Sequence, residues 1–263
     1  MSFIKSISFD TARQHPFPFN IAAVKFAKQI MLESPVTIFV GDNGCGKSTL
    51  LESIALSLDL PLIGGYIKNH PGFEAARLLQ RDLRIEWRRE TKKGFFFRAE
   101  DFSDFINAVE KENNSIASQL SELEGNVDDS IIRQMRDSMN YSLHAMRRQY
   151  GDNMQAFSHG EAYLNILQTR IHDKGVYLLD EPEAALSPLK QLSLMAFLME
   201  VLKRGNAQFI MATHSPILMG MPGAVLYEIT EDRMEKVEFK ETEHYRITKN
   251  FLENPGNYLR HLG

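Results

Sequence analysis

One stretch of the chain combines glycines, a lysine and a hydroxyl group at a spacing that suits phosphate binding. Residues 41–48 read Gly-Asp-Asn-Gly-Cys-Gly-Lys-Ser and match the pattern G-x-x-x-x-G-K-[ST]. Glycines let the backbone curl so that successive N–H groups point inward, and a helix that begins at Lys47 adds the positive end of its dipole. Lys47 would then reach the β- and γ-phosphates of ATP, and Ser48 would bind Mg²⁺. The predicted ATP-binding residues are Gly41, Asp42, Asn43, Gly44, Cys45, Gly46, Lys47, Ser48 and Thr49.

Two adjacent carboxylates follow an apolar run later in the chain. Residues 176–179 read Val-Tyr-Leu-Leu, and Asp180 and Glu181 come directly after them. Asp180 would hold Mg²⁺, directly or through water, and Glu181 would polarise the water that attacks the γ-phosphate. Acidic residues at strand ends are common, so this pair becomes informative because a phosphate-binding loop precedes it. Together the two motifs predict an ATP hydrolase.

These motifs need a sheet whose strands end at a common edge. The β-branched run at residues 36–40 predicts a buried strand before the loop, and the apolar spacing of residues 47–58 predicts a helix after it. Further strands are expected at residues 175–179, 208–212 and 225–229. Strands that alternate with helices indicate an α/β fold with a largely parallel sheet.

The region between the loop and the carboxylates has a different pattern. Residues 83–87 alternate between apolar and polar types, and the Gly-Phe-Phe-Phe run at residues 94–97 follows across a polar turn, which predicts a hairpin. From residue 101 the chain is polar and charged, with helical spacing of apolar residues. We predict a helical subdomain at residues 101–157, inserted into a single domain that spans residues 1–263.

Composition favours a globular protein of the cytoplasm. Of 263 residues 43% are hydrophobic and 24% are charged, with a formal net charge of −4. This charge gives no global reason to expect nucleic-acid binding, although a local basic patch would still permit it. Cys45 is the single cysteine, which excludes an intramolecular disulfide and fits a reducing compartment. The apolar runs are too short to cross a bilayer, so a cytoplasmic location is expected.

Three further motifs resemble those of the ABC ATPases. The Ser-His-Gly-Glu stretch at residues 158–161 is similar to the family's signature motif in its S-x-G-E form. Residues 181–187 resemble the extended Walker B motif and D-loop, and residues 213–216, Thr-His-Ser-Pro, resemble the H-loop. This resemblance covers most of the chain and implies a P-loop NTPase fold, an ABC-type ATPase domain with a mixed, largely parallel sheet. The signature residues are Ser158, His159, Gly160 and Glu161.

The resemblance also implies how the site is assembled. In this family the signature motif of one protomer contacts the γ-phosphate bound by the other, so the active form is expected to be an ATP-sandwiched homodimer. His214 is expected to contact the γ-phosphate and to act with Glu181 in catalysis. The predicted cofactor is Mg²⁺, held by Ser48 and Asp180, with ATP as substrate.

Two departures from the family pattern concern communication within the dimer and with partners. Ser187 stands where the D-loop often ends in aspartate. No glutamine occupies a plain Q-loop position, and either Arg98 or Glu100 is a candidate substitute. The alternative to this role is that these side chains only form an ordinary ion pair on the surface.

Three functions remain compatible with these motifs. We favour a soluble, stand-alone ATPase switch related to the SMC and RecF-like group, which would act on nucleic acid or a soluble effector protein in nucleic-acid or defence-related processes. The first alternative is the nucleotide-binding subunit of a membrane transporter; the missing glutamine and the modified D-loop disfavour a membrane partner. The second alternative is a non-enzymatic, nucleotide-gated interaction module.

Overall fold

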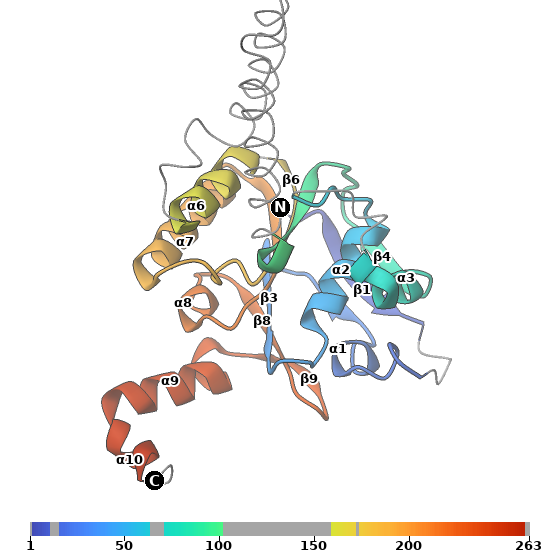
Figure 1. The fold of residues 1–263 in the computed structure, drawn as a ribbon. Helices are drawn as coiled ribbons and strands as arrows, with labels where there is room; N and C mark the ends of the chain where they lie inside the picture. Colours follow the sequence, from blue (N-terminus) through green and yellow to red (C-terminus); the bar gives the residue numbers. More distant parts are fainter. Residues whose placement is uncertain (1, 11–15, 64–70, 102–158, 172–173, 261–263) are drawn as a thin grey trace, which may run out of the picture. The chain divides into compact units, whose positions relative to one another are not determined.

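The computed structural model describes residues 2–10, 16–63, 71–101, 159–171 and 174–260 (Figure 1). The chain forms two compact units, residues 1–99 with 172–263 and residues 100–171. The second unit contains α6 (His159–Arg170). The predicted helical subdomain at residues 101–157 lies outside the described residues apart from residue 101. Its helical character and its role therefore stay predictions.

A six-stranded sheet forms the framework of the first unit. Five of its strands are parallel, and only β9 runs antiparallel, to β8. This arrangement confirms the predicted α/β fold with a largely parallel sheet. The strands lie in the order β5 (Gly94–Arg98), β6 (Lys174–Asp180), β7 (Asn206–Ala212), β3 (Val36–Gly41), β8 (Val225–Ile229) and β9 (Met234–Val237).

A second, antiparallel sheet contains three strands in the order β2 (Ile30–Met31), β1 (Ile4–Phe9) and β4 (Leu83–Trp87). The predicted hairpin of residues 83–87 with 94–97 is therefore wrong. β4 pairs with β1, whereas β5 pairs in parallel with β6. The burial patterns explain the difference. β4 alternates between buried and more exposed side chains, as a strand with one wet face does, whereas Phe95, Phe96 and Phe97 are all buried.

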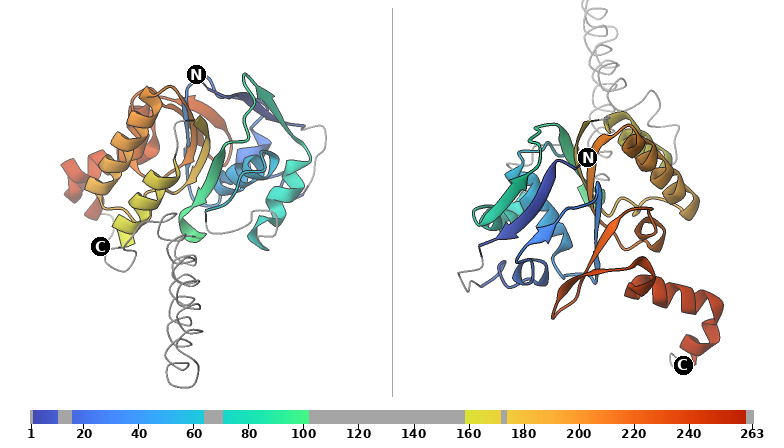
Figure 2. Two further views of the ribbon diagram at one scale, coloured as in Figure 1. Left: turned by 90° about the horizontal axis from the view of Figure 1, so that it is seen from above. Right: turned by 180° about the vertical axis from the view of Figure 1, so that it is seen from behind.

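Helices cover the sheets of the first unit (Figures 1 and 2). α2 (Lys47–Ser57) packs on one face of the six-stranded sheet, and α7 (Pro188–Lys203) covers the opposite face with Leu194 and Leu198 buried. The helix predicted at residues 47–58 is thus confirmed. The remaining helices are α1 (Ala22–Lys25), α3 (Glu74–Gln80), α8 (Pro216–Met219), α9 (Glu243–Glu253) and α10 (Pro255–Leu259), with 3-10 turns at Pro71–Phe73 and Phe239–Glu241.

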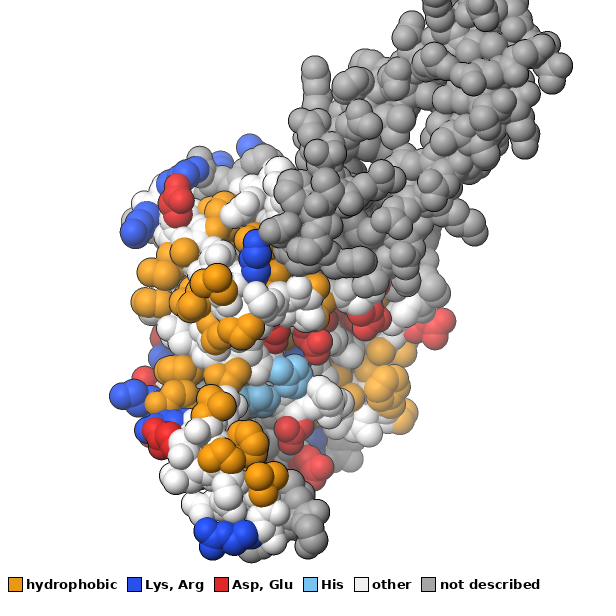
Figure 3. Space-filling model, turned by 60° about the vertical axis from the view of Figure 1, so that its left-hand side comes forward, with side chains coloured by type: hydrophobic (Ala, Val, Ile, Leu, Met, Phe, Trp, Pro, Cys, Tyr) orange, Lys and Arg blue, Asp and Glu red, His pale blue; other side chains and the backbone are white. Residues whose placement is uncertain are grey.

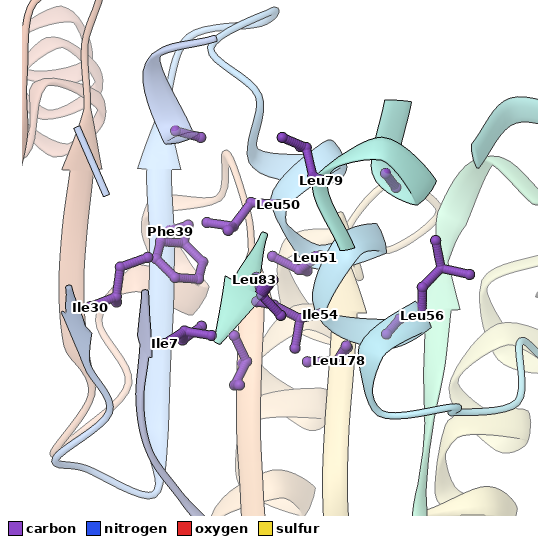
Figure 4. Close-up of a cluster of buried hydrophobic side chains, with 14 of the residues drawn as sticks. Ile7, Ile30, Phe39, Leu50, Leu51, Ile54, Leu56, Leu79, Leu83 and Leu178 are labelled. Atoms are coloured by element: carbon purple, nitrogen blue, oxygen red, sulfur yellow. The ribbon is translucent and has the colours of Figure 1, made fainter. Parts of the chain in front are cut away.

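The main hydrophobic core lies around α2 (Figure 4). Leu51 and Ile54 of α2 are fully buried in one cluster with Ile7 of the small sheet and Leu178 of the large one. Burying one such side chain stabilises the fold by roughly 1.5–3 kcal/mol. Because the phosphate-binding loop leads directly into α2, this core fixes the position of the loop. Within the described ranges, no helix is both long and apolar enough to span a bilayer.

Candidate functional site

The phosphate-binding loop connects β3 to α2, as the sequence predicts. Gly44 and Gly46 have left-handed backbone conformations, with φ of 83° and 98°. The positive φ of Gly46 favours glycine, and an added Cβ atom would also lie 2.8 Å from Cδ1 of Ile21, so that this side chain would have to move. Asp42, Asn43 and Gly44 are exposed, which leaves the outer side of the loop open to a ligand.

Lys47 lies across this loop with only 5% of its surface exposed. Its Nζ atom donates to the carbonyl oxygens of Gly41 and Asp42 at 2.8 and 2.9 Å. The third neighbour of the ammonium group is Sγ of Cys45 at 3.8 Å, and sulfur is a weak acceptor. A phosphate oxygen would be a much better acceptor for this buried charge. The loop therefore holds a lysine whose charge suits a phosphate group.

Asp180 ends β6 beside the loop and is 5% exposed. Its carboxyl group is hydrogen-bonded with Ser48, and its Oδ1 atom is buried with no hydrogen-bond partner in the described part of the chain. Burial raises the pKa of Asp180 to about 7, against the Ser48 hydrogen bond and the positive charges of Arg98 and Lys47. A buried carboxylate with an unused oxygen, next to a hydroxyl, suits a hard divalent cation such as Mg²⁺.

The protein supplies few ligands to such a cation. Among the described residues, no three or more His, Cys, Asp or Glu side chains cluster as a metal site would require. Mg²⁺ usually takes one or two protein oxygens and completes its shell with water and substrate phosphates. Ser48 and Asp180 therefore fit Mg²⁺ that arrives with ATP better than a resident metal ion.

The burial of Asp180 predicts how stability depends on pH in the absence of nucleotide. The pKa of this carboxyl is about 7 in the folded chain, whereas an unfolded aspartate titrates near 3.9. Folding thus favours the neutral acid, and this stabilisation is complete below about pH 4 and is lost as pH rises through 7. We expect Asp180→Asn to remove this loss, so that urea unfolding from pH 5 to 8 shows a shallower decline, by on the order of 2–4 kcal/mol.

A matched control for this measurement is Asp232→Asn. Hydrogen bonding by Thr230 lowers the pKa of Asp232, an exposed residue, so it stays ionised throughout pH 5–8. The pH slope of that variant is expected to equal that of the wild type. Parallel slopes for Asp180→Asn and wild type would contradict the burial of an ionisable Asp180.

Arg98, a candidate replacement for the Q-loop glutamine, ends β5 in register with Asp180. Its guanidinium group lies 3.4 Å from Oε1 of Glu52 and 5.0 Å from the ring centre of Phe73. Both members of the ion pair are 7% exposed, so the alternative of a surface ion pair is wrong for Arg98. The other candidate, Glu100, belongs to the second unit. The structure therefore places Arg98, and its charge, next to the predicted magnesium ligand.

Glu181 adopts a left-handed backbone conformation, with φ of 49°, which costs a non-glycine residue roughly 1–2 kcal/mol. Its N–H group donates to the carbonyl of Ala212 at 2.9 Å, and its side chain is 45% exposed. The Oε1 atom lies 3.6 Å from Nε2 of His214. The two residues predicted to be catalytic are therefore neighbours, and backbone strain of this kind is concentrated at functional sites.

Glu183 holds the H-loop in place. Its Oε1 atom accepts hydrogen bonds from the N–H groups of His214 and Ser215 at 2.6 and 3.1 Å. The Ser215 hydroxyl donates to Gln191 of α7 at 2.6 Å and also caps α8. Neither Glu183 nor Gln191 is assigned a separate role by the sequence motifs. The sequence feature that could have pointed to Glu183 is the Glu-Pro-Glu pattern, in which a second acidic residue follows Glu181 by two positions.

The side chain of His214 is half-buried, and the charges of Lys47 and Glu181 act on it. Burial lowers its pKa, and the positive charge of Lys47 acts in the same direction. The imidazole is therefore neutral near pH 7. Its Nδ1 atom lies 3.1 Å from Nε2 of His244, a residue of α9 that belongs to none of the sequence motifs.

The signature motif belongs to the second unit. Ser158 lies outside the described residues, and of His159, Gly160 and Glu161 only the backbone, within α6, is described. A helix thus follows Ser158, as the capping pattern of the motif requires. The role of these four residues in a partner's ATP site stays a prediction.

The chain is similar to several known proteins. A family model described as "ABC transporter" matches residues 30–184, and a second model, for an AAA domain (AbiEii toxin, Type IV TA system), matches residues 162–220. The phosphate import ATP-binding protein PstB of Synechococcus sp. (strain CC9902) is 29% identical over 196 residues, which cover 74% of this chain and 68% of that protein. The bacitracin export ATP-binding protein BceA of Halalkalibacterium halodurans is 24% identical over 72% of this chain and 70% of its own length. Among solved structures, cbiO1 of Clostridium perfringens, part of the ABC transporter complex cbiONQ, is 19% identical, with a TM-score of 0.43 over 89% of each chain.

Proposed function

Because the chain belongs to the ABC transporter family of ATP-binding proteins, we propose that two copies close on two ATP molecules and serve as nucleotide-binding subunits of a membrane transporter. The chain is an ATPase of the ABC class, and its P-loop NTPase fold is that of the family. The observation that carries the catalytic part of the proposal is the grouping of Lys47, Asp180, Glu181 and His214 at one end of the parallel strands.

Each of these side chains has a distinct part in the proposed reaction. Lys47 and the loop N–H groups bind the β- and γ-phosphates. Ser48 and Asp180 would hold Mg²⁺, which would neutralise charge on the phosphate oxygens. Glu181 accepts a proton from water as the water oxygen bonds to the γ-phosphorus and the bond to ADP breaks. The Nε2–H group of His214 donates to a γ-phosphate oxygen.

The relatives support the membrane partner. They are ATP-binding proteins of phosphate import and of bacitracin export, which work in opposite directions across a membrane. A subunit of this kind would work at the cytoplasmic face of the membrane, on a separate transmembrane protein. The cargo, and the direction of transport, follow from that partner and not from this chain.

The soluble ATPase switch that the sequence motifs favour is the second candidate. It is supported by the buried Arg98–Glu52 pair at the place expected for the Q-loop glutamine, and by Ser187, which precedes α7 where the family often has aspartate. Its kinship with the SMC and RecF-like group stays a prediction. The third possibility, a non-enzymatic module, is disfavoured because members of the family hydrolyse ATP.

One experiment separates the two candidates. A Glu181→Gln variant, held in its ATP-bound state, is incubated with detergent-solubilised membranes and with cytosol from the same cells, and recovered material is identified by mass spectrometry and nucleic-acid staining. A transporter subunit is expected to retain an integral membrane protein at least about tenfold better with ATP than without it, a gain of about 1.4 kcal/mol. Lys47→Ala combined with Glu181→Gln is the control, because it cannot bind ATP. ATP-dependent recovery of DNA or of a soluble protein alone would favour the switch.

A further inference from the structure

Two histidines that are distant in sequence meet next to the catalytic carboxylate. Nδ1 of His214 and Nε2 of His244 are 3.1 Å apart, and the ring centres are 5.3 Å apart. On the other side of His214, Nε2 lies 3.6 Å from Oε1 of Glu181. Figure 3 shows a face of the molecule on which histidine and acidic side chains gather. His214 thus lies between a carboxylate and a second imidazole.

The neighbours of each nitrogen determine where the protons lie. Nε2 of His214 lies 3.6 Å from Oε1 of Glu181 and has no hydrogen-bond partner among the described residues, but the negative charge of an ionised carboxylate favours the proton on this nitrogen. A neutral His214 then has an unprotonated Nδ1 atom, which accepts a hydrogen bond from Nε2–H of His244. His244 in turn has an unprotonated Nδ1 atom. That atom is buried and has no hydrogen-bond partner among the described residues, as is also true of Nε2 of His214, so its lone pair follows from the donation by Nε2–H of His244 and not from its surroundings.

Contacts of its neighbours hold the backbone of His244 in place in the first turn of α9. Thr242, fully buried, caps α9 by accepting from the N–H group of Tyr245 at 3.3 Å. The N–H group of Glu243 donates to Glu228 of β8 at 2.9 Å. The ring of Phe239 packs on Tyr245, with centres 4.7 Å apart. These contacts on both sides of His244 fix its backbone to the sheet.

The rest of α9 has a different character. No side chain of α9 or α10 is buried, and the apolar residues Ile247, Phe251 and Leu252 are exposed. The tight anchoring is therefore confined to the turn that carries His244. We infer that this anchoring serves the contact between His244 and His214, next to Glu181.

We propose that His244 is a positioning residue for ATP hydrolysis. By donating Nε2–H to Nδ1 of His214, it fixes the tautomer and the ring orientation in which Nε2–H of His214 points to Glu181 and the γ-phosphate. His244 itself contacts neither the substrate nor the water and acts through His214. This inference rests on the proposed function, in which His214 contacts the γ-phosphate.

Three substitutions at position 244 test this role. The side-chain amide nitrogen of glutamine reaches about as far as Nε2 of histidine and can donate the same hydrogen bond, whereas asparagine is too short and alanine has no donor. We expect His244→Ala and His244→Asn to lower kcat about 10- to 100-fold while KM for ATP changes less than about threefold. His244→Gln is expected to stay within about threefold of wild type. Lys249→Ala, an exposed residue on the same helix, is the control and is expected to behave as wild type.

The tautomer of His214 can also be read directly. Long-range ¹H–¹⁵N spectra of histidine-labelled protein are expected to show the Nε2–H form of His214 in wild type and in His244→Gln, and a mixture of tautomers in His244→Asn. Full activity in both His244→Ala and His244→Asn would overturn the proposal, as would equal losses in Gln and Asn variants that retain the wild-type melting temperature. If His214→Ala itself hydrolyses ATP normally, the proposed role of His214 fails instead. Loss in His214→Ala without loss at position 244 refutes the inference alone.

Discussion

Lys47→Ala is expected to abolish ATP binding and, with it, hydrolysis. The variant loses the buried ammonium group that lies within 3 Å of two loop carbonyls and faces the predicted phosphate position. A charge-assisted hydrogen bond contributes roughly 1.5–3 kcal/mol, and this lysine would make more than one to the phosphates. We therefore expect the dissociation constant to rise at least about 100-fold, measured by titration calorimetry with Mg-ATP.

Because Lys47 is buried, the experiment needs a variant that separates charge from packing. Methionine has a similar length and no charge, so Lys47→Met keeps the space filled while removing the phosphate contact. Both variants are expected to lose the increase in melting temperature that Mg-ATP gives wild type, since ligand stabilisation follows the affinity for the folded state. Retained ATP-dependent stabilisation in Lys47→Met would contradict the placement of Lys47 at the phosphates.

The sequence sufficed for the parts of the site that are local in the chain. The loop at residues 41–48, its flanking strand and helix, and Asp180 and Glu181 at the end of β6 lie within short stretches whose patterns reflect their own burial. The neighbourhood of Glu181 and His214 could be anticipated only through the family resemblance. Their contact depends on the parallel pairing of β6 with β7, which places both strand ends at one edge.

What sequence reasoning missed depends on contacts between distant segments. β4 pairs with β1 rather than with its neighbour β5, because the phenylalanines of β5 need a place buried on both faces. Gln208 is fully buried, accepts from the N–H groups of Phe3 and Ile4 at 2.8 and 2.7 Å, and so links the two sheets. Nothing local to Gln208 distinguishes this role from that of an ordinary strand residue. The same holds for His244, because its proposed role depends on the position of the first turn of α9 next to His214.

Glu181→Gln is expected to bind ATP normally and to hydrolyse it at least 100-fold more slowly than wild type. The amide keeps the shape of the side chain but cannot accept a proton from the attacking water, and general base catalysis typically contributes about 10²- to 10⁴-fold. The side chain is 45% exposed, so the substitution buries no new unpaired group and is expected to leave folding intact. Phosphate release under saturating ATP measures the loss. Glu200→Gln, the same change on the exposed face of α7, is the control.

The same variant tests whether the site is shared between two chains. With hydrolysis blocked, ATP is expected to accumulate in a closed dimer, which light scattering detects after gel filtration in Mg-ATP. Adding Ser158→Arg to Glu181→Gln is expected to return the protein to monomers without loss of ATP binding, because a bulky cation would fill the place of the partner's γ-phosphate. Normal hydrolysis by Glu181→Gln would remove Glu181 from the role of base. A dimer that forms equally with and without Ser158→Arg would instead leave the base in place and refute the shared site, since only that step depends on a signature motif supplied by the second chain.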